Sequence, residues 1–217
     1  MAACDSQLKL YLSALATREG LATTSAGSEP EAVAETGKKR RSRKPKGNLP
    51  AFDLAEELER ILGVNAKRID GIDVMTIQTV LAEVGPDLSA WKSEDQWSSW
   101  LNLAPKHDIS GGRVIRHRRE YRTHRAGNAF RMAAESLVRS QSYLGARYRY
   151  LRAKLGGLKA VKATARVLAC LYYRLVTKGQ LWVDRGTAEF ERRRQQRDLA
   201  SLQRKARGLG MQLMPAA

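Results

Sequence analysis

Helical spacing of apolar residues dominates the sequence between residues 52 and 178. The stretch from Ile72 to Val84, for example, has apolar residues three and four positions apart and stops at Gly85. Only one short run, Arg113–Ile115, has the composition of a strand. These patterns predict a mainly α fold. We expect a compact helical domain containing a helix-hairpin-helix-like element, with a flexible basic linker and an extended C-terminal helix.

Four segments of the chain differ in composition. Residues 1–18 carry an apolar helical stripe from Leu8 to Leu15, and residues 19–49 are mostly small and polar. Residues 50–180 contain the helical pattern, and residues 181–217 are highly charged. The sequence therefore predicts a helical arm, a disordered basic linker, a helical domain and a charged helical tail.

The charge of the chain favours a polyanionic partner. Lys and Arg number 39 against 22 Asp and Glu, which gives a formal net charge of +17 and a pI near 10.3. Nucleic acid is favoured over an acidic membrane surface, because no long amphipathic membrane helix or apolar span is evident. Two cysteines, Cys4 and Cys170, are too few for a disulfide framework or a zinc site.

A basic run stands out inside the predicted linker. Between Lys38 and Lys46, seven of nine residues are Lys or Arg. The run has two interpretations: an arm that binds phosphates and orders on RNA or DNA, or a solubilising linker segment. The total charge of the chain favours the arm.

Further helices are predicted over residues 52–62, 126–144, 161–175 and 187–208. Tyrosines and arginines alternate near the end of the second of these helices. Their positions are Tyr143, Arg147, Tyr148, Arg149, Tyr150 and Arg152. This interleaving suits contacts to phosphates and bases, although a hydrated helix end explains it nearly as well.

The helix-hairpin-helix-like element is centred on Gly71, which lies between Ile69 and Ile72. In such a hairpin a glycine permits a tight turn, and exposed amide hydrogens can meet a phosphate. Asp73 takes the place of the usual second glycine and would repel a phosphate. A helix-turn-helix used only for packing is therefore an equal alternative.

An aromatic helix follows this element. Ser93 and Gln96 have the spacing of a capping box, and Trp97 and Trp100 lie after it on one helical face. Tryptophan stacks well on nucleic-acid bases. Core packing is favoured here, because the rings repeat at helical spacing beside leucines.

The segment Pro105–Arg113 is predicted to be a loop, because it contains Ser110-Gly111-Gly112. It leads into a dense group of arginines. A flexible serine beside concentrated positive charge suits attack on a phosphodiester, since arginines can stabilise the developing phosphorane charge. Spacing alone favours a plainer alternative, a solvated turn beside a phosphate-binding patch.

The order of these motifs carries a resemblance. The run GIDVMTIQTVLAEVG, the pattern W-x(5)-W-x(2)-W-L-x-L-A-P and the basic ISGG loop resemble the carboxy-terminal domain of bacterial insertion-sequence transposases of the "IS one-ten" group, relatives of the Piv DNA invertase. The similarity covers most of residues 50–217. It implies DNA transposition with Ser110 as the nucleophile of a phosphoserine intermediate. It also implies a structured guide RNA and a cytoplasmic, nucleoid-associated place in a bacterium.

Members of that group also have an amino-terminal RuvC-like domain whose four acidic residues bind metal, and this sequence shows no counterpart. We therefore expect a truncated or split form, with residues 1–18 as the remnant of a joining arm. Magnesium is expected only with the acidic domain, supplied by a partner chain or through homo-oligomerisation. Whether the chain is an active enzyme stays open. The alternatives are a non-catalytic RNA- or DNA-binding helical protein from a degenerate element, and a basic protein that coats nucleic acid.

The resulting candidate site has Ser110 as its catalytic residue and no metal ligand. The residues expected to contact nucleic acid are glycines of the loop and basic residues of the loop and the linker. They are Lys106, Gly111, Gly112, Arg113, Arg116, Arg118, Arg119, Arg122, Arg125, Lys39, Arg40, Arg41 and Arg43.

Overall fold

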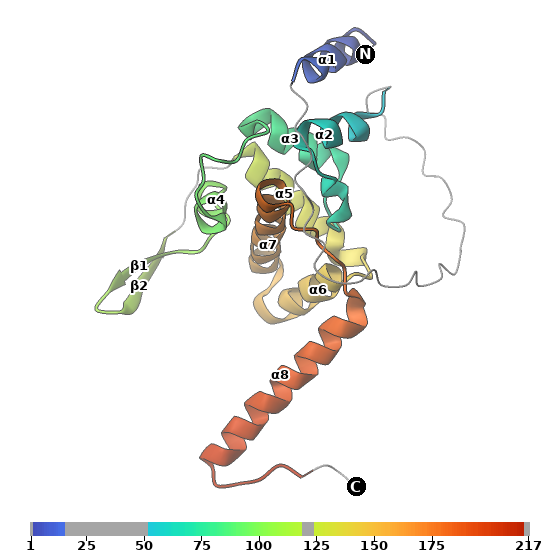
Figure 1. The fold of residues 1–217 in the computed structure, drawn as a ribbon. Coiled ribbons are helices and arrows are strands. Elements are labelled where there is room, and N and C mark those ends of the chain that lie inside the picture. The colour runs from blue at the N-terminus through green and yellow to red at the C-terminus, as the bar shows by residue number, and fades with distance from the viewer. Residues whose placement is uncertain (1, 16–51, 119–123, 215–217) are drawn as a thin grey trace.

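The structure is a computed structural model that describes residues 2–15, 52–118 and 124–214. Its helices are α1 (Ala2–Ala14), α2 (Leu54–Leu62), α3 (Val74–Val84), α4 (Glu94–Trp100), α5 (Arg125–Ser136), α6 (Tyr143–Leu155), α7 (Gly157–Lys178) and α8 (Gly186–Gly208). The described residues also form two short 3₁₀ turns, η1 (Ala66–Arg68) and η2 (Leu137–Arg139). They form two strands, β1 (Lys106–Ser110) and β2 (Arg113–Arg118). The prediction of a mainly α fold with a compact helical domain is confirmed (Figure 1).

Helix α7 lies at the centre of the fold, and α4, α5 and α6 pack against it (Figure 1). Its buried face includes Ala160, Ala165 and Ala169, which are fully buried and let the neighbouring helices approach closely. Tyr172 fills the space between α7 and α5, where its ring meets Phe130 edge-on with centroids 5.7 Å apart. Burial of this apolar face holds the helices together.

The tryptophans of α4 belong to this core. Trp97 has no exposed surface and donates its indole hydrogen to the carbonyl oxygen of Ala169 at 3.0 Å. Trp91 and Trp100 lie 4.8 and 5.8 Å from it, measured between ring centroids. The predicted cap is present, because Ser93 accepts a hydrogen bond from the backbone of Gln96. The core-packing interpretation of this helix is confirmed.

The turn at Gly71 faces the interior of the fold. Gly71 has φ +90°, and a Cβ on it would lie 2.9 Å from the side chain of Leu137 in η2. Beside it, the carboxylate of Asp70 accepts hydrogen bonds from the hydroxyls of Ser140 and Ser142. Asp73 caps α3 by accepting from the backbone of Thr76 at 2.8 Å. This geometry agrees with the packing alternative for the element.

At two places a polar cap moves the start of a helix from its predicted position. The single helix predicted over residues 126–144 is interrupted, and a new helix, α6, begins after Ser142, whose hydroxyl accepts from the backbone of Gly145. The helix predicted from Phe52 begins at Leu54, because Asp53 caps it by accepting from the backbone of Ala55. In both places a short polar side chain satisfies the free amides of the first turn and so fixes the start of the helix.

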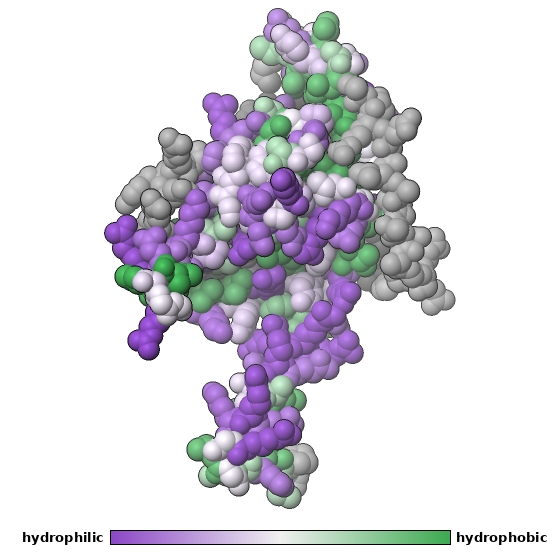
Figure 2. Space-filling view, turned by 60° about the vertical axis from the view of Figure 1, so that its left-hand side comes forward, coloured by the Kyte–Doolittle hydropathy of each residue, from purple (hydrophilic) through white to green (hydrophobic). Residues whose placement is uncertain are grey.

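The first and last helices lie at the edges of this core. On α1, Leu12 is buried, but Tyr11 is 73% exposed, so the predicted apolar stripe only partly faces the fold. Arg60 of α2 donates to the carbonyl oxygen of Leu12 at 2.8 Å. Helix α8 extends away from the body and is largely hydrophilic, and its buried residue is Phe190 (Figures 1 and 2). No helix within the described residues is long and apolar enough to cross a membrane.

Candidate nucleic-acid interface

Ser110 lies at the end of a β-hairpin, where composition predicted a loop. Strands β1 and β2 are antiparallel, and Ser110 is directly opposite Arg113. Between them, Gly111 and Gly112 have φ +55° and +73°. Positive φ at both central positions is what a two-residue type I′ turn requires, and the twist of that turn matches two antiparallel strands. The glycine pair therefore specifies a hairpin, and the prediction of a loop for residues 105–113 was wrong.

The register of the hairpin places arginines beside the serine. Asp108 is opposite Arg116, and Ile115 is the extra residue of a β-bulge. Directly opposed residues share a face of the hairpin, and so do alternate residues of one strand. Ser110, Arg113, Asp108 and Arg116 therefore lie on one face.

One of the predicted phosphate ligands already has an acidic neighbour. The guanidinium of Arg116 lies 3.7 Å from the carboxylate of Asp108, and both side chains are exposed. An exposed ion pair of this kind stabilises a fold by less than about 1 kcal/mol. Arg116 can therefore exchange this carboxylate for a phosphate with little loss of folding stability.

The hairpin projects away from the helical body (Figure 1). Its apolar side chains are open to solvent, with Ile109 63% and Ile115 70% exposed. An isolated two-stranded hairpin is marginally stable in water. A partner that covers its exposed apolar side chains would stabilise it. Its shape and exposure suit insertion into a larger complex.

Described residues that flank the hairpin in the sequence pack on the core at one place. Leu103 and Ala104, which precede β1, are buried. On the far side, the ring of His124 stacks on Trp100, and Glu83 of α3 accepts from the backbone of Ala126. The junction of α4 and α5 therefore sets where the hairpin leaves the fold.

The remaining predicted contact residues are more scattered. Lys106 begins β1, and Arg125 is exposed at the start of α5, so both are at the base of the hairpin and not at its tip. The backbone of Arg118 pairs with that of Lys106. The predicted residues outside the described part of the chain are Arg119, Arg122, Lys39, Arg40, Arg41 and Arg43.

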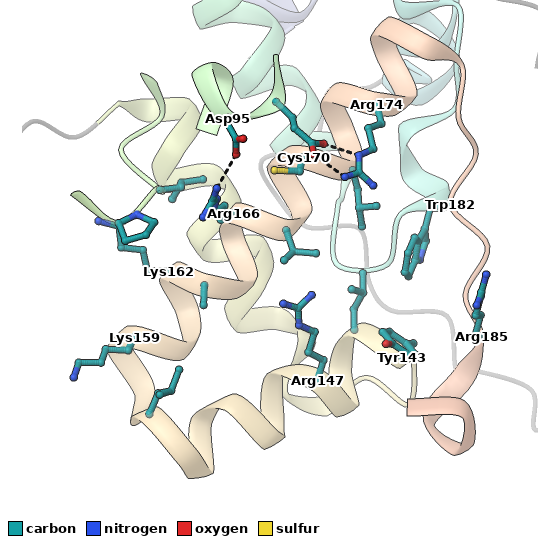
Figure 3. Close-up of a pocket in the computed structure, with 18 of the residues that line it drawn as sticks. Asp95, Tyr143, Arg147, Lys159, Lys162, Arg166, Cys170, Arg174, Trp182 and Arg185 are labelled. Atoms are coloured by element: carbon teal, nitrogen blue, oxygen red, sulfur yellow. Dashed lines mark hydrogen bonds and ion pairs between the residues drawn. The ribbon is translucent and has the colours of Figure 1, made fainter. Parts of the chain in front are cut away.

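A basic groove lies beside the hairpin base, and the sequence interpretation missed it. The groove has a volume of about 1460 Å³ and is bounded by α4, α6, α7, α8, residues 181–185 and the start of β1 (Figure 3). Its basic lining residues are Lys106, Arg147, Lys159, Lys162, Arg166, Arg174, Arg185 and Arg193. The positions of Lys159, Lys162 and Arg166 on one face of α7 were a detectable sequence pattern.

The two carboxylates among the groove residues are already paired. Arg174 holds Glu94 through two hydrogen bonds of 2.5 and 2.7 Å, and Arg166 donates to Asp95 at 2.8 Å. The hydrogen bond from Arg174 is the main reason why the pKa of Glu94 lies below its ordinary value. The groove therefore keeps a positive surplus.

Cys170 lies on the groove wall and is half-buried. Burial raises the pKa of its thiol, which disfavours the reactive thiolate. Among the described residues, no group of three or more His, Cys, Asp and Glu side chains could hold a metal ion. The described groove and hairpin thus offer cations, hydroxyl groups and aromatic rings.

The tyrosines and arginines of α6 divide between two roles. Tyr143 and Arg147 line the groove. Arg149 instead donates to the backbone of Ser140, and Tyr148 is buried. Their even alternation in sequence therefore does not correspond to one continuous binding surface.

Fold and site together define a mainly helical domain that presents a basic, serine-tipped hairpin. The sequence profile of the Transposase IS116/IS110/IS902 family matches residues 64–149, which include α3 to α5, the hairpin and the first half of α6. This stretch is similar to that transposase family, and the similarity supports a general role in DNA transposition. No curated protein and no solved structure matches the chain.

Proposed function

We propose that the chain is the serine-nucleophile and nucleic-acid-binding part of an RNA-guided transposase, in which Ser110 attacks a DNA phosphodiester. The observation that supports this most is the position of Ser110 at the tip of an exposed hairpin, opposite Arg113. The matched family stretch contains this hairpin. A tip that projects from the helical body can reach a DNA backbone.

In the proposed step, the Ser110 hydroxyl oxygen forms a bond to phosphorus as the bond to the leaving deoxyribose oxygen breaks. The leaving oxygen takes a proton, and the strand end stays attached to the protein as a phosphoserine ester. Arg113, and Arg116 once it exchanges Asp108, would hold the non-bridging oxygens through charge-assisted hydrogen bonds. In the reverse step, the hydroxyl of a different strand end attacks the phosphoserine ester and releases the serine. The DNA is then rejoined without an external energy source.

Among the described residues, no side chain that could accept the serine proton is hydrogen-bonded to Ser110. The Ser110 hydroxyl has no hydrogen-bond partner among the described residues. Among the described residues, no group of three or more His, Cys, Asp and Glu side chains could hold magnesium. We expect both functions to come from an acidic domain on a partner chain or another copy, positioned by the guide RNA.

A second candidate function is nucleic-acid binding without covalent attack by Ser110. This function is favoured because no base is hydrogen-bonded to Ser110 among the described residues, and a binding protein from a degenerate element needs only the positive surface. Both functions use the same basic residues, so binding measurements alone do not separate them.

The separating experiment is a search for a covalent protein–DNA adduct. Purified chain, guide RNA, magnesium and DNA are combined with the acidic domain, and the products are run on a denaturing gel. The wild-type protein and a control, Ser201→Ala in α8, should form the adduct, whereas Ser110→Ala should bind DNA equally well and form none. An adduct with Ser110→Ala would reject Ser110, and no adduct with any of the proteins would favour the binding function.

A further inference from the structure

The groove beside the hairpin base contains cations that no described carboxylate neutralises. Arg147, Lys159 and Arg185 line it and form no ion pair with another described residue. In Figure 3, Lys159 lies at one end of the groove, Arg185 at the other, and Arg147 points into the space between α6 and α7. A row of three unpaired cations suits an extended anion.

Arg147 is the most informative of the three. It is half-buried, and burial is the main reason why its pKa lies below the ordinary arginine value. A charged group held partly out of water without a counter-ion destabilises the folded protein. An anion brought by a ligand would remove that penalty.

Aromatic and apolar side chains form the wall next to Arg147. The rings of Tyr143 and Trp182 meet edge-on with centroids 6.2 Å apart (Figure 3). The indole Nε1 of Trp182 is buried and has no hydrogen-bond partner. Leu144 and Leu171 add apolar surface to the same groove.

This combination distinguishes between kinds of nucleic acid. A duplex presents phosphates and hides its stacked bases, so it needs cations but not an apolar wall. An unpaired strand exposes its bases, and proteins bind such strands with a positive groove and aromatic side chains. The volume of about 1460 Å³ also exceeds the roughly 300–1,000 Å³ of ordinary small-molecule pockets.

We infer that the groove binds an unpaired, single-stranded segment of nucleic acid, with a phosphate on Arg147 and a base against the Tyr143–Trp182 pair. Lys159 and Arg185 would hold neighbouring phosphates at the two ends of the groove. Lys106 and His107, the first residues of β1, also line it, so the strand would run past the base of the hairpin. Binding of this kind does not depend on any chemistry at Ser110.

The test compares Arg147→Met with Arg152→Met. Both substitutions remove one positive charge from α6, but Arg152 is exposed and does not line the groove. Binding is measured with labelled oligothymidylate and oligouridylate of roughly 12 nucleotides, within the site sizes of known single-strand-binding folds, and with a duplex of the same length. No cleavage takes place in this assay, so its outcome is independent of the adduct experiment.

We expect Arg147→Met to weaken single-strand binding roughly tenfold, as the loss of one charge-assisted hydrogen bond should. Its slope of log affinity against log salt should fall by about 0.7, the value for one phosphate contact on a single strand. Arg152→Met and duplex binding should change much less. Equal losses for the two variants, or an equal loss for the duplex, would overturn the inference. Tighter binding of oligothymidylate would identify the strand as DNA, and tighter binding of oligouridylate would identify it as RNA.

Two further readouts separate binding from folding. The melting temperature of Arg147→Met should equal or exceed that of the wild type, because the variant lacks the uncompensated charge. A clear fall would show that Arg147 has a structural role instead. Tryptophan fluorescence should be quenched by the oligonucleotide, and Trp182→Phe should lose most of that quenching. Undiminished quenching in Trp182→Phe would contradict the proposed contact between a base and Trp182.

Discussion

The imidazole of His124 stacks on the indole of Trp100, with ring centroids 4.4 Å apart and 28° between their planes. Trp100 ends α4, and His124 precedes α5, so this contact joins the two helices from which the hairpin emerges. Trp100 in turn packs on the buried Trp97. The location of Ser110 therefore depends on a tightly packed junction, and changes there should affect both stability and the hairpin.

Gly127→Ala should destabilise the fold at this junction. A Cβ at Gly127 would lie 2.5 Å from the carbonyl oxygen of Leu101, so the backbone of α5 or the end of α4 must move. We expect a loss of about 1–3 kcal/mol in the free energy of unfolding, measured by urea denaturation. Gly157→Ala is the matched control, since nothing lies within 4 Å of a Cβ at that position. Equal stability for the two variants would contradict the packing described here.

The ion pair between Glu94 and Arg174 should make stability depend on pH in the acid range. The pKa of Glu94 is lowered from 4.5, chiefly by the hydrogen bond from Arg174. A lowered carboxyl pKa contributes stability that is present above the ordinary value and is lost as the pH falls through the folded value. The pair is substantially exposed, so the contribution is below about 1 kcal/mol.

Unfolding free energies of the wild type and Glu94→Gln should therefore differ at neutral pH. They should converge as the pH falls below 4.5, the ordinary value for this carboxyl. A difference that grows on acidification would contradict the assignment.

Nucleic-acid affinity should depend steeply on salt concentration. In the proposed function, the arginines of the hairpin, the groove and the predicted basic arm all contact phosphates. If about six phosphates are neutralised, affinity for structured RNA or DNA should fall roughly a thousandfold between about 50 and 200 mM salt. Fluorescence anisotropy titrations at several salt concentrations measure this slope. An affinity that does not change with salt would rule out phosphate neutralisation as the source of binding.

Local patterns predicted the helical core better than the site. Ile77, Val80 and Leu81 repeat at helical spacing, because one face of α3 is buried, and the structure confirms that helix. The hairpin escaped prediction because β1 begins with Lys106, His107 and Asp108, whose polar side chains give little strand preference. The Gly-Gly turn was the available indication, and it was interpreted only as flexibility.

The groove could not be found from local patterns. Its cations come from β1, α6, α7, α8 and the segment before α8, which only tertiary packing brings together. The sequence around Arg147 gave no sign that this side chain would be half-buried without a counter-ion among the described residues. Such properties depend on long-range contacts, which neither composition nor periodicity contains.

The most direct test of the serine-nucleophile proposal is to locate the DNA attachment by mass spectrometry. The covalent adduct formed with guide RNA, magnesium and the acidic domain is digested with a protease and a nuclease, and its peptides are sequenced. The proposal predicts that a residual nucleotide is carried by Ser110 in the hairpin peptide, and that the Ser110→Ala protein yields no modified peptide. A nucleotide attached to any other residue would contradict it.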